Sequence, residues 1–197
     1  MGTSLSALLG ALLATSGAPL ASAPAPAVAR ATGAFVEPLK DERGVEGLRS
    51  TFVVDAPADA VLNVLWDVSR FKSIFPEVRD MQVLAHHPGN TIDVRFEIDA
   101  VVASPSYTLR RCLTPAAAGG GEVSWLSIAG DIKSIRGSWL VVPIDATRCR
   151  VIYTSFVDVG PVFVSGMVRG VAMRKATDLA ERVRAAARRY ASAAPAH

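Results

Sequence analysis

Hydrophobic and charged residues alternate with a period of two between Asn90 and Ala100. The even positions 92–98 are all apolar, and the odd positions 93–99 are all charged. This pattern is typical of a β-strand that buries one face and exposes the other. Strands are also predicted for five further segments rich in β-branched and aromatic residues: residues 48–54, 105–113, 122–128, 135–142 and 150–159.

Apolar residues at helical spacing predict three helices. Pro57 suits the first turn of a helix, and apolar residues then recur between Ala60 and Val68. A second, short helix is expected from Arg70 to Ile74, because the next residue, Phe75, precedes a proline and so disfavours helical geometry. The segment Pro161 to Tyr190 predicts one long amphipathic helix whose basic residues lie largely off its apolar stripe.

The order of these elements indicates an α+β fold of the helix-grip type. One strand is followed by two short helices, a run of strands joined by short turns, and one long helix. An antiparallel sheet with one apolar face needs a cover, and the C-terminal helix is the only element long enough to supply it. A sheet curled around a helix leaves a cavity between them, and such a cavity suits a ligand.

Several short motifs follow one another through this pattern. They are Ala56-Pro57 with Val61, Leu65, Trp66 and Asp67, then Phe71, Phe75, Pro76 and Val78, and later Gly137-Ser138-Trp139 and Arg148-Cys149-Arg150-Val151 before the terminal helix. In these motifs, over about residues 47–189, the chain resembles the START-like superfamily of pollen-allergen proteins, polyketide cyclases/dehydrases and coenzyme Q-binding proteins. The resemblance implies a seven-stranded antiparallel sheet gripping the helix, with a hydrophobic ligand between them. It does not identify the ligand, because one fold hosts many functions.

Strand alternation predicts which side chains line such a cavity. Trp125 and Trp139 serve equally as plain core, and the hydroxyls of Tyr107 and Tyr153 can bind either a ligand or the backbone. Arg111 either holds an anionic or quinone oxygen of a ligand or, after a one-residue shift in register, lies in solvent. The expected lining from the strands is Phe96, Tyr107, Leu109, Arg111, Val123, Trp125, Ser127, Gly137, Trp139, Tyr153 and Ser155, and from the helix Val164, Val168, Val171 and Ala172.

The ends of the chain differ from this domain, which is expected over residues 47–190. Residues 1–31 hold a short apolar run, Leu5 to Leu13, followed by A-x-A sites, and predict a signal peptide or a disordered leader. With a true signal peptide the protein is exported, to the periplasm or outside the cell; otherwise it is cytoplasmic. Residues 32–46 are expected to be an irregular lead-in and 191–197 a disordered tail.

Charge and residue chemistry exclude several classes of protein. A formal net charge of +3 is too small to indicate nucleic-acid binding by itself. The basic face of the last helix is either a solvated surface or a contact for an anionic membrane. Neither a metal site nor a cofactor is expected: His86 and His87 are adjacent in a turn-like setting, and no phosphate-binding or nucleophile motif is present. Cys112 and Cys149 are expected to be free, since strands three positions apart are roughly 14 Å from each other.

Three functions remain open from the sequence. The favoured one is a non-enzymatic binder or carrier of a lipid, quinone or polyketide-like molecule. The second is an enzyme of the cyclase/dehydrase type that orients a reactive polyketone, with Tyr107, Arg111 and Tyr153 as its working groups. The third is a ribosome- or protein-interaction module, which would require residence in the cytosol.

Overall fold

The computed structural model describes residues 33–99, 105–158 and 165–193, and within the last range the side chains of residues 176–190. The chain divides into the units Met1–Ala31 and Thr32–His197, and the described residues all belong to the second unit. The leader expected at residues 1–31 and the tail expected at 191–197 therefore lie outside the described structure, apart from helical backbone as far as Ala193.

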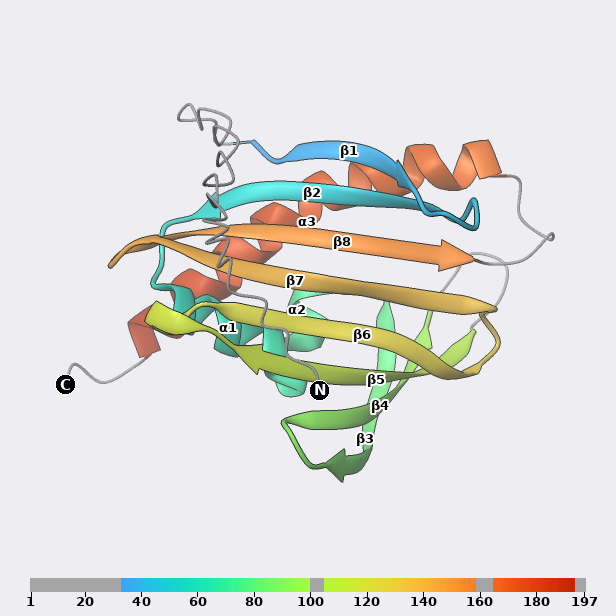
Figure 1. Cartoon of the computed structure of the whole chain (residues 1–197), viewed down its shortest axis with the longest axis horizontal. Helices are drawn as coiled ribbons and strands as arrows, with labels where there is room; N and C mark the ends of the chain where they lie inside the picture. Colours follow the sequence, from blue (N-terminus) through green and yellow to red (C-terminus); the bar gives the residue numbers. More distant parts are fainter. Residues whose placement is uncertain (1–32, 100–104, 159–164, 194–197) are drawn as a thin grey trace, which may run out of the picture. The chain divides into compact units, whose positions relative to one another are not determined.

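The described residues form one antiparallel sheet with helices on one side of it (Figure 1). The sheet order is β1-β2-β8-β7-β6-β5-β4-β3, so β1 and β3 are its edges. The strands are β1 (Phe35–Lys40), β2 (Glu46–Val54), β3 (Val78–His87), β4 (Thr91–Ile98), β5 (Ser106–Pro115), β6 (Gly121–Gly130), β7 (Ser134–Asp145) and β8 (Arg148–Asp158).

The sheet has eight strands where seven were expected. β1 lies inside the segment expected to be an irregular lead-in; it is a short edge strand interrupted by Pro38, which gives no clear alternation. β3 carries register shifts between Val78 and Asp80 and between Val83 and Ala85. Each irregularity displaces the side chains by one position, so the period of two is lost along this strand.

The helices are α1 (Ala58–Trp66), the 3-10 turn η1 (Val68–Arg70), α2 (Phe71–Ile74) and α3 (Ser165–Ala193), and a second 3-10 turn, η2 (Ala117–Gly119), joins β5 to β6. The three predicted helices are confirmed. α2 ends at Ile74, and the next residue, Phe75, has a φ of −120° and a ψ of 82°, outside the helical region that a residue before proline disfavours. α1 contacts α3, β6 and β7, α2 contacts α3 and β3, and α3 contacts β1 and β2.

The core lies between the sheet and the helices. Val61, Val64 and Leu65 of α1 are fully or almost fully buried, as are Val94 of β4 and Val183 of α3. The apolar stripe predicted for the last helix is buried wherever its side chains are described, at Ala176, Leu179, Val183 and Ala187. The fold is therefore a helix-grip, with its hydrophobic interior on one face of the sheet only.

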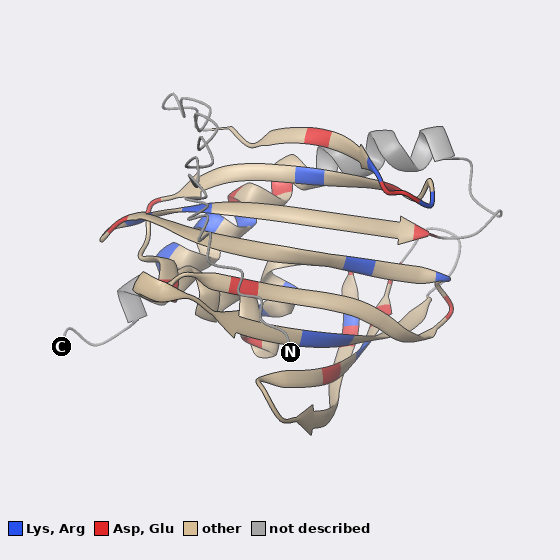
Figure 2. Cartoon of the chain, viewed as in Figure 1, with Lys and Arg blue, Asp and Glu red and all other residues tan. Residues whose placement is uncertain are grey.

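The opposite face of the sheet carries charges of both signs, mixed along the strands (Figure 2). Arg49 pairs with Glu37 across β2 and β1 at 3.1 Å, and Arg110 pairs with Asp93 across β5 and β4 at 2.8 Å. The Arg49–Glu37 pair is partly exposed and contributes little to stability, whereas the carboxylate of Asp93 is buried beneath Arg110.

Candidate ligand-binding site

The register of the sheet brings the predicted lining residues onto one face. Directly opposed residues of an antiparallel pair share a face. The pairs run across five strands, with one register shift between Thr108 and Leu109 where β5 pairs with β6. Every strand position expected to point inward belongs to this set: Phe96 with Tyr107, Leu109 with Ser127, Arg111 with Trp125, Trp125 with Gly137, Val123 with Trp139, Trp139 with Tyr153, and Gly137 with Ser155. This is the helix-facing side, because Phe96 and Trp139 are almost completely buried.

Seven aromatic rings form a continuous chain on this face. Five come from strands, and Phe71 and Phe75 come from α2 and the residue that follows it. Neighbouring ring centroids lie close enough for tilted or stacked contacts: Tyr107–Phe96 at 5.6 Å, Phe96–Phe71 at 5.1 Å, Phe71–Phe75 at 4.5 Å, Phe75–Trp139 at 6.3 Å, Trp139–Tyr153 at 4.3 Å, Tyr153–Trp125 at 5.9 Å and Trp125–Trp139 at 6.3 Å.

Gly137 makes room for one of these rings. A Cβ atom built at this position would lie 2.6 Å from Cζ2 of Trp125 and 2.2 Å from the carbonyl oxygen of Thr154. Only a residue without a side chain lets the Trp125 indole lie against the backbone of β7. The Gly-Ser-Trp motif thus supplies both a ring, at Trp139, and the space for its neighbour.

Hydroxyl groups accompany the aromatic chain. Burial raises the pKa of Tyr107, and the nearby Tyr153 and Glu77 raise it further. Burial and the charge of Glu77 also raise the pKa of Tyr153, against the opposing effect of its hydrogen bond with Ser155. Both phenols therefore stay protonated at neutral pH and can donate a hydrogen bond.

One buried serine hydroxyl on this face has no partner in the described part of the chain. Ser50 of β2 is directly opposite Tyr153, it is completely buried, and its Oγ makes no hydrogen bond. A buried hydroxyl without a partner destabilises a fold by about 1–3 kcal/mol. Sequence reasoning missed Ser50, although it has the same parity in its strand as Phe52 and Val54, which are both buried.

Arg111 points inward and is 1% exposed, so the solvent-exposed alternative is wrong. Its Nη2 donates to the carbonyl of Leu65 at 2.6 Å and its Nη1 to the carbonyl of Trp66 at 3.2 Å. The guanidinium also lies 5.3 Å from the ring centre of Trp66 and 5.2 Å from that of Phe71. Burial lowers its pKa to about 10. Arg111 thus binds the carbonyl end of α1, where a helix favours positive charge.

The helix side of the predicted lining is only partly described. Val164 lies outside the described residues, and Val168, Val171 and Ala172 belong to α3 but their side chains lie outside the described part. Their contact with a ligand stays a prediction. Phe71 and Phe75 are the rings that the predicted lining left out, although both belong to the motifs that carry the family resemblance.

Part of the basic face expected on the last helix is used inside the protein. Arg184 is 9% exposed, donates to the carbonyl of Val53 at 2.9 Å and lies over the ring of Phe52. Arg182 donates to the carbonyl of Ile74 at 3.2 Å. These two cations attach α3 to β2 and α2, which leaves fewer of them for an external surface.

Three further features of the described part of the chain concern metal ligands, cysteines and membrane-spanning helices. Within it, no group of three His, Cys, Asp or Glu side chains is placed to hold a metal ion. Both cysteines are free, as predicted. Among the described helices, none is long and apolar enough to cross a membrane.

The sequence profile of one protein family, described as polyketide cyclase / dehydrase and lipid transport, matches residues 54–184, more than half of the chain. The chain belongs to this family. A comparison with curated protein sequences gives no match.

Solved structures with the same architecture include an aromatase/cyclase and lipid transfer proteins, the two kinds of protein that the family description names. An aromatase/cyclase named Zhui from a Streptomyces species is 24% identical, with a TM-score of 0.63 over 83% of this chain and 100% of that one. A STAR-related lipid transfer protein of Xanthomonas axonopodis is 19% identical, with a TM-score of 0.68 over 80% and 95% of the two chains. Human STARD10 is 15% identical, with a TM-score of 0.70 over 81% and 71%. At these identities the likeness establishes a shared fold.

Proposed function

We propose that this family member binds and carries a hydrophobic small molecule, such as a lipid, quinone or polyketide-like compound, against the helix-facing side of the sheet. The observation that carries the proposal is the chain of seven aromatic rings accompanied by buried hydroxyls. The family description, with its lipid transport, and the lipid transfer protein with the same fold support it.

The chemistry of this face defines the ligand. Aromatic rings offer a large apolar surface with few rotatable bonds, which suits a flat or extended hydrophobic molecule. The two protonated tyrosines can donate to a carbonyl or hydroxyl oxygen, and Ser50 can provide a further hydrogen bond. The expected ligand is therefore mostly apolar and carries one or two neutral oxygen atoms.

Native mass spectrometry of the full chain before and after organic extraction tests this proposal. We expect a defined molecule released in a near one-to-one ratio. Ser155→Phe fills space on the inner face and should abolish this bound mass, whereas Thr154→Phe, the next residue on the outer face, should retain it. If the chain is isolated empty and binds none of a panel of lipids, quinones and polyketide mimics, the carrier proposal is wrong.

Catalysis of a cyclase type is the second candidate, and one observation favours it. Glu77, which pairs with Arg182 at 3.7 Å, raises the pKa of both Tyr107 and Tyr153, so a carboxylate lies near two phenol donors. A carboxylate can accept a proton from carbon next to a carbonyl while the phenols bind the carbonyl oxygens. Incubation with a linear polyketone mimic should then yield a cyclised product, at a rate lowered by Tyr107→Phe and Tyr153→Phe. Equal rates for wild type and variants would exclude this role.

Export and membrane contact complete the proposal. A carrier with a cleaved leader at residues 1–31 would work outside the cytoplasm, and N-terminal sequencing of the protein made in its host tests this.

Arg188 and Arg189 are exposed near the C-terminal end of α3 and can contact an anionic lipid surface. Sedimentation with vesicles containing phosphatidylglycerol should decrease when both are changed to Gln.

A further inference from the structure

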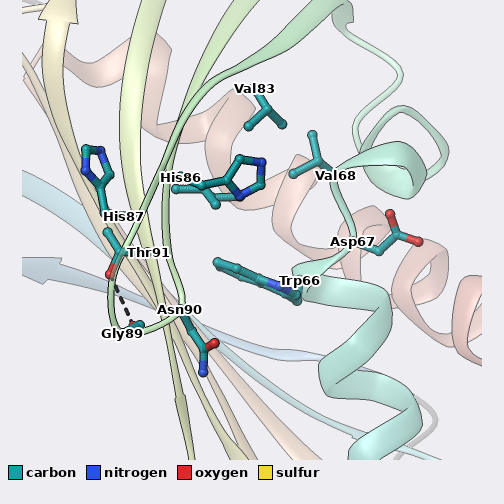
Figure 3. Close-up of a pocket in the computed structure, with 10 residues that line it drawn as sticks. Trp66, Asp67, Val68, Val83, His86, His87, Gly89, Asn90 and Thr91 are labelled. Carbon is teal, nitrogen blue, oxygen red and sulfur yellow. Dashed lines mark hydrogen bonds between the residues drawn. The ribbon is translucent and has the colours of Figure 1, made fainter.

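A hollow lies beside the β3–β4 hairpin, and it is separate from the chain of seven aromatic rings. Its volume is about 630 Å³, and it opens between the hairpin and the segment that follows α1 (Figure 3). None of the seven rings of the aromatic chain lines it. The hollow is open to solvent on one side, so a ligand would be covered only in part.

The walls of the hollow are largely apolar. Trp66 and Val68 come from the end of α1 and η1, and Val83 and Ile92 come from β3 and β4. Val83 is 37% exposed, which leaves a large apolar side chain partly in water. In Figure 3 the His86 ring points into the space between Val83 and the Trp66 indole. A planar ring placed on Trp66 would cover this exposed apolar surface.

One buried cation lies behind the floor of the hollow. Its one lining carboxylate, Asp67, accepts hydrogen bonds from Ser69 and from Arg70 Nε at 2.8 Å, and points away from Trp66 in Figure 3. Behind the indole lies the guanidinium of Arg111, which has no carboxylate partner among the described residues. The carbonyls of Leu65 and Trp66 balance part of this charge, and the remaining field favours an anion over a cation on the other face of the indole.

Two polar side chains of the hollow are available for a ligand. The His86 imidazole and the Asn90 carboxamide make no hydrogen bond with the described residues, and both carry N–H donors. His87, by contrast, pairs with Asp93 at 2.8 Å, and Asp93 also pairs with Arg110. The hollow thus combines an aromatic floor, largely apolar walls, the His86 N–H donor and a buried cation behind its floor.

We propose that this hollow is a second binding site, for a planar aromatic carboxylate. The ring lies on the Trp66 indole, and the carboxylate accepts a hydrogen bond from the His86 imidazole. An aromatic cation is disfavoured by the same features, because Asp67 is already paired and Arg111 repels it.

Titration calorimetry of the full chain with 2-naphthoate tests the site. The control probe is 2-naphthylmethylammonium, which carries the same ring but a positive charge. We expect 2-naphthoate to bind at least about tenfold more tightly than the ammonium compound. Val83→Asp places a carboxylate on the wall and should weaken 2-naphthoate by at least about tenfold. Leu84→Asp is the control, because Leu84 is the next residue, is 51% exposed and does not line the hollow.

Further measurements separate this site from the proposed carrier site and from simple misfolding. His86→Glu, on an exposed residue, should reproduce the loss seen with Val83→Asp, and thermal unfolding shows whether each variant is folded. Ser155→Phe should leave 2-naphthoate binding unchanged. Equal binding of both probes, an equal loss in Leu84→Asp, or a loss confined to Ser155→Phe would each overturn the proposal.

Discussion

The side chain of Arg111 reaches from β5 to the carbonyl of Leu65, with 2.6 Å between Nη2 and the oxygen. This contact joins the middle of the sheet to the end of α1, over a separation of 46 residues in the chain. The same guanidinium lies against Trp66, which is also the floor of the hollow beside the hairpin. Arg111 therefore contacts α1, the ring of Phe71 in the aromatic chain, and Trp66 at the floor of the hollow beside the hairpin.

Replacing Arg111 by Ala should destabilise the protein strongly. The change leaves the carbonyls of Leu65 and Trp66 without their donor and opens a cavity between two rings. We expect the free energy of unfolding to fall by about 2–4 kcal/mol in urea denaturation. Arg95→Ala, on the outer face of β4, is the control and should change it by less than about 1 kcal/mol. Equal effects would show that Arg111 does not hold α1.

Gly137→Ala should displace Trp125. The new Cβ would meet the indole at 2.6 Å and the carbonyl of Thr154 at 2.2 Å, so the ring and the strand must both shift. We expect a loss of about 1–3 kcal/mol in stability and a red shift of tryptophan fluorescence. Gly89→Ala is the comparison: its φ of +72° makes alanine strained there, but nothing lies within 4 Å, so fluorescence should not change.

Alkaline pH should destabilise the protein through its buried tyrosines. The pKa values of Tyr107 and Tyr153 lie above the ordinary 10.0 in the folded state, so the unfolded chain loses these protons first as pH rises. The stabilisation is complete below pH 10 and is lost progressively above it. Melting temperatures measured from pH 8 to 11 should fall less steeply in Tyr153→Phe than in wild type, whereas Tyr190→Phe should follow wild type. An unchanged slope in Tyr153→Phe would contradict this.

The two thiols should differ sharply in reactivity. Cys149 is completely buried, and burial raises its pKa to about 12, so its thiolate is absent at neutral pH. Cys112 is partly exposed. Ellman's reagent at pH 8 should titrate one thiol in the folded protein and two after unfolding. Cys112→Ser should abolish the fast reaction, and a fast reaction that survives in this variant would show that β8 opens.

The regular alternation of apolar and polar residues allowed part of this structure to be predicted from the sequence. Residues 91–98, with their strict period of two, form β4 as predicted, and the same parity argument placed Arg111, Trp125 and Tyr153 on the inner face. β3 could not be read in this way, because its two register shifts break the period. The partners of Arg111 were also beyond sequence reasoning, since the carbonyls of Leu65 and Trp66 carry no sequence information. Arg182 and Arg184 looked like surface charges for the same reason.

The sequence by itself determined the α+β class, the long amphipathic helix, the inner face of the central strands and the family likeness. These features depend on local periodicity: within one segment, the spacing of the apolar residues is enough to predict the element and its buried face. Tertiary structure alone decided the eighth strand, the chain of seven rings, the carbonyl partners of Arg111 and the hollow beside the hairpin. Each of these joins residues far apart in the chain, and their contacts arise only when the strands have taken their register and α1 and α2 lie against the sheet.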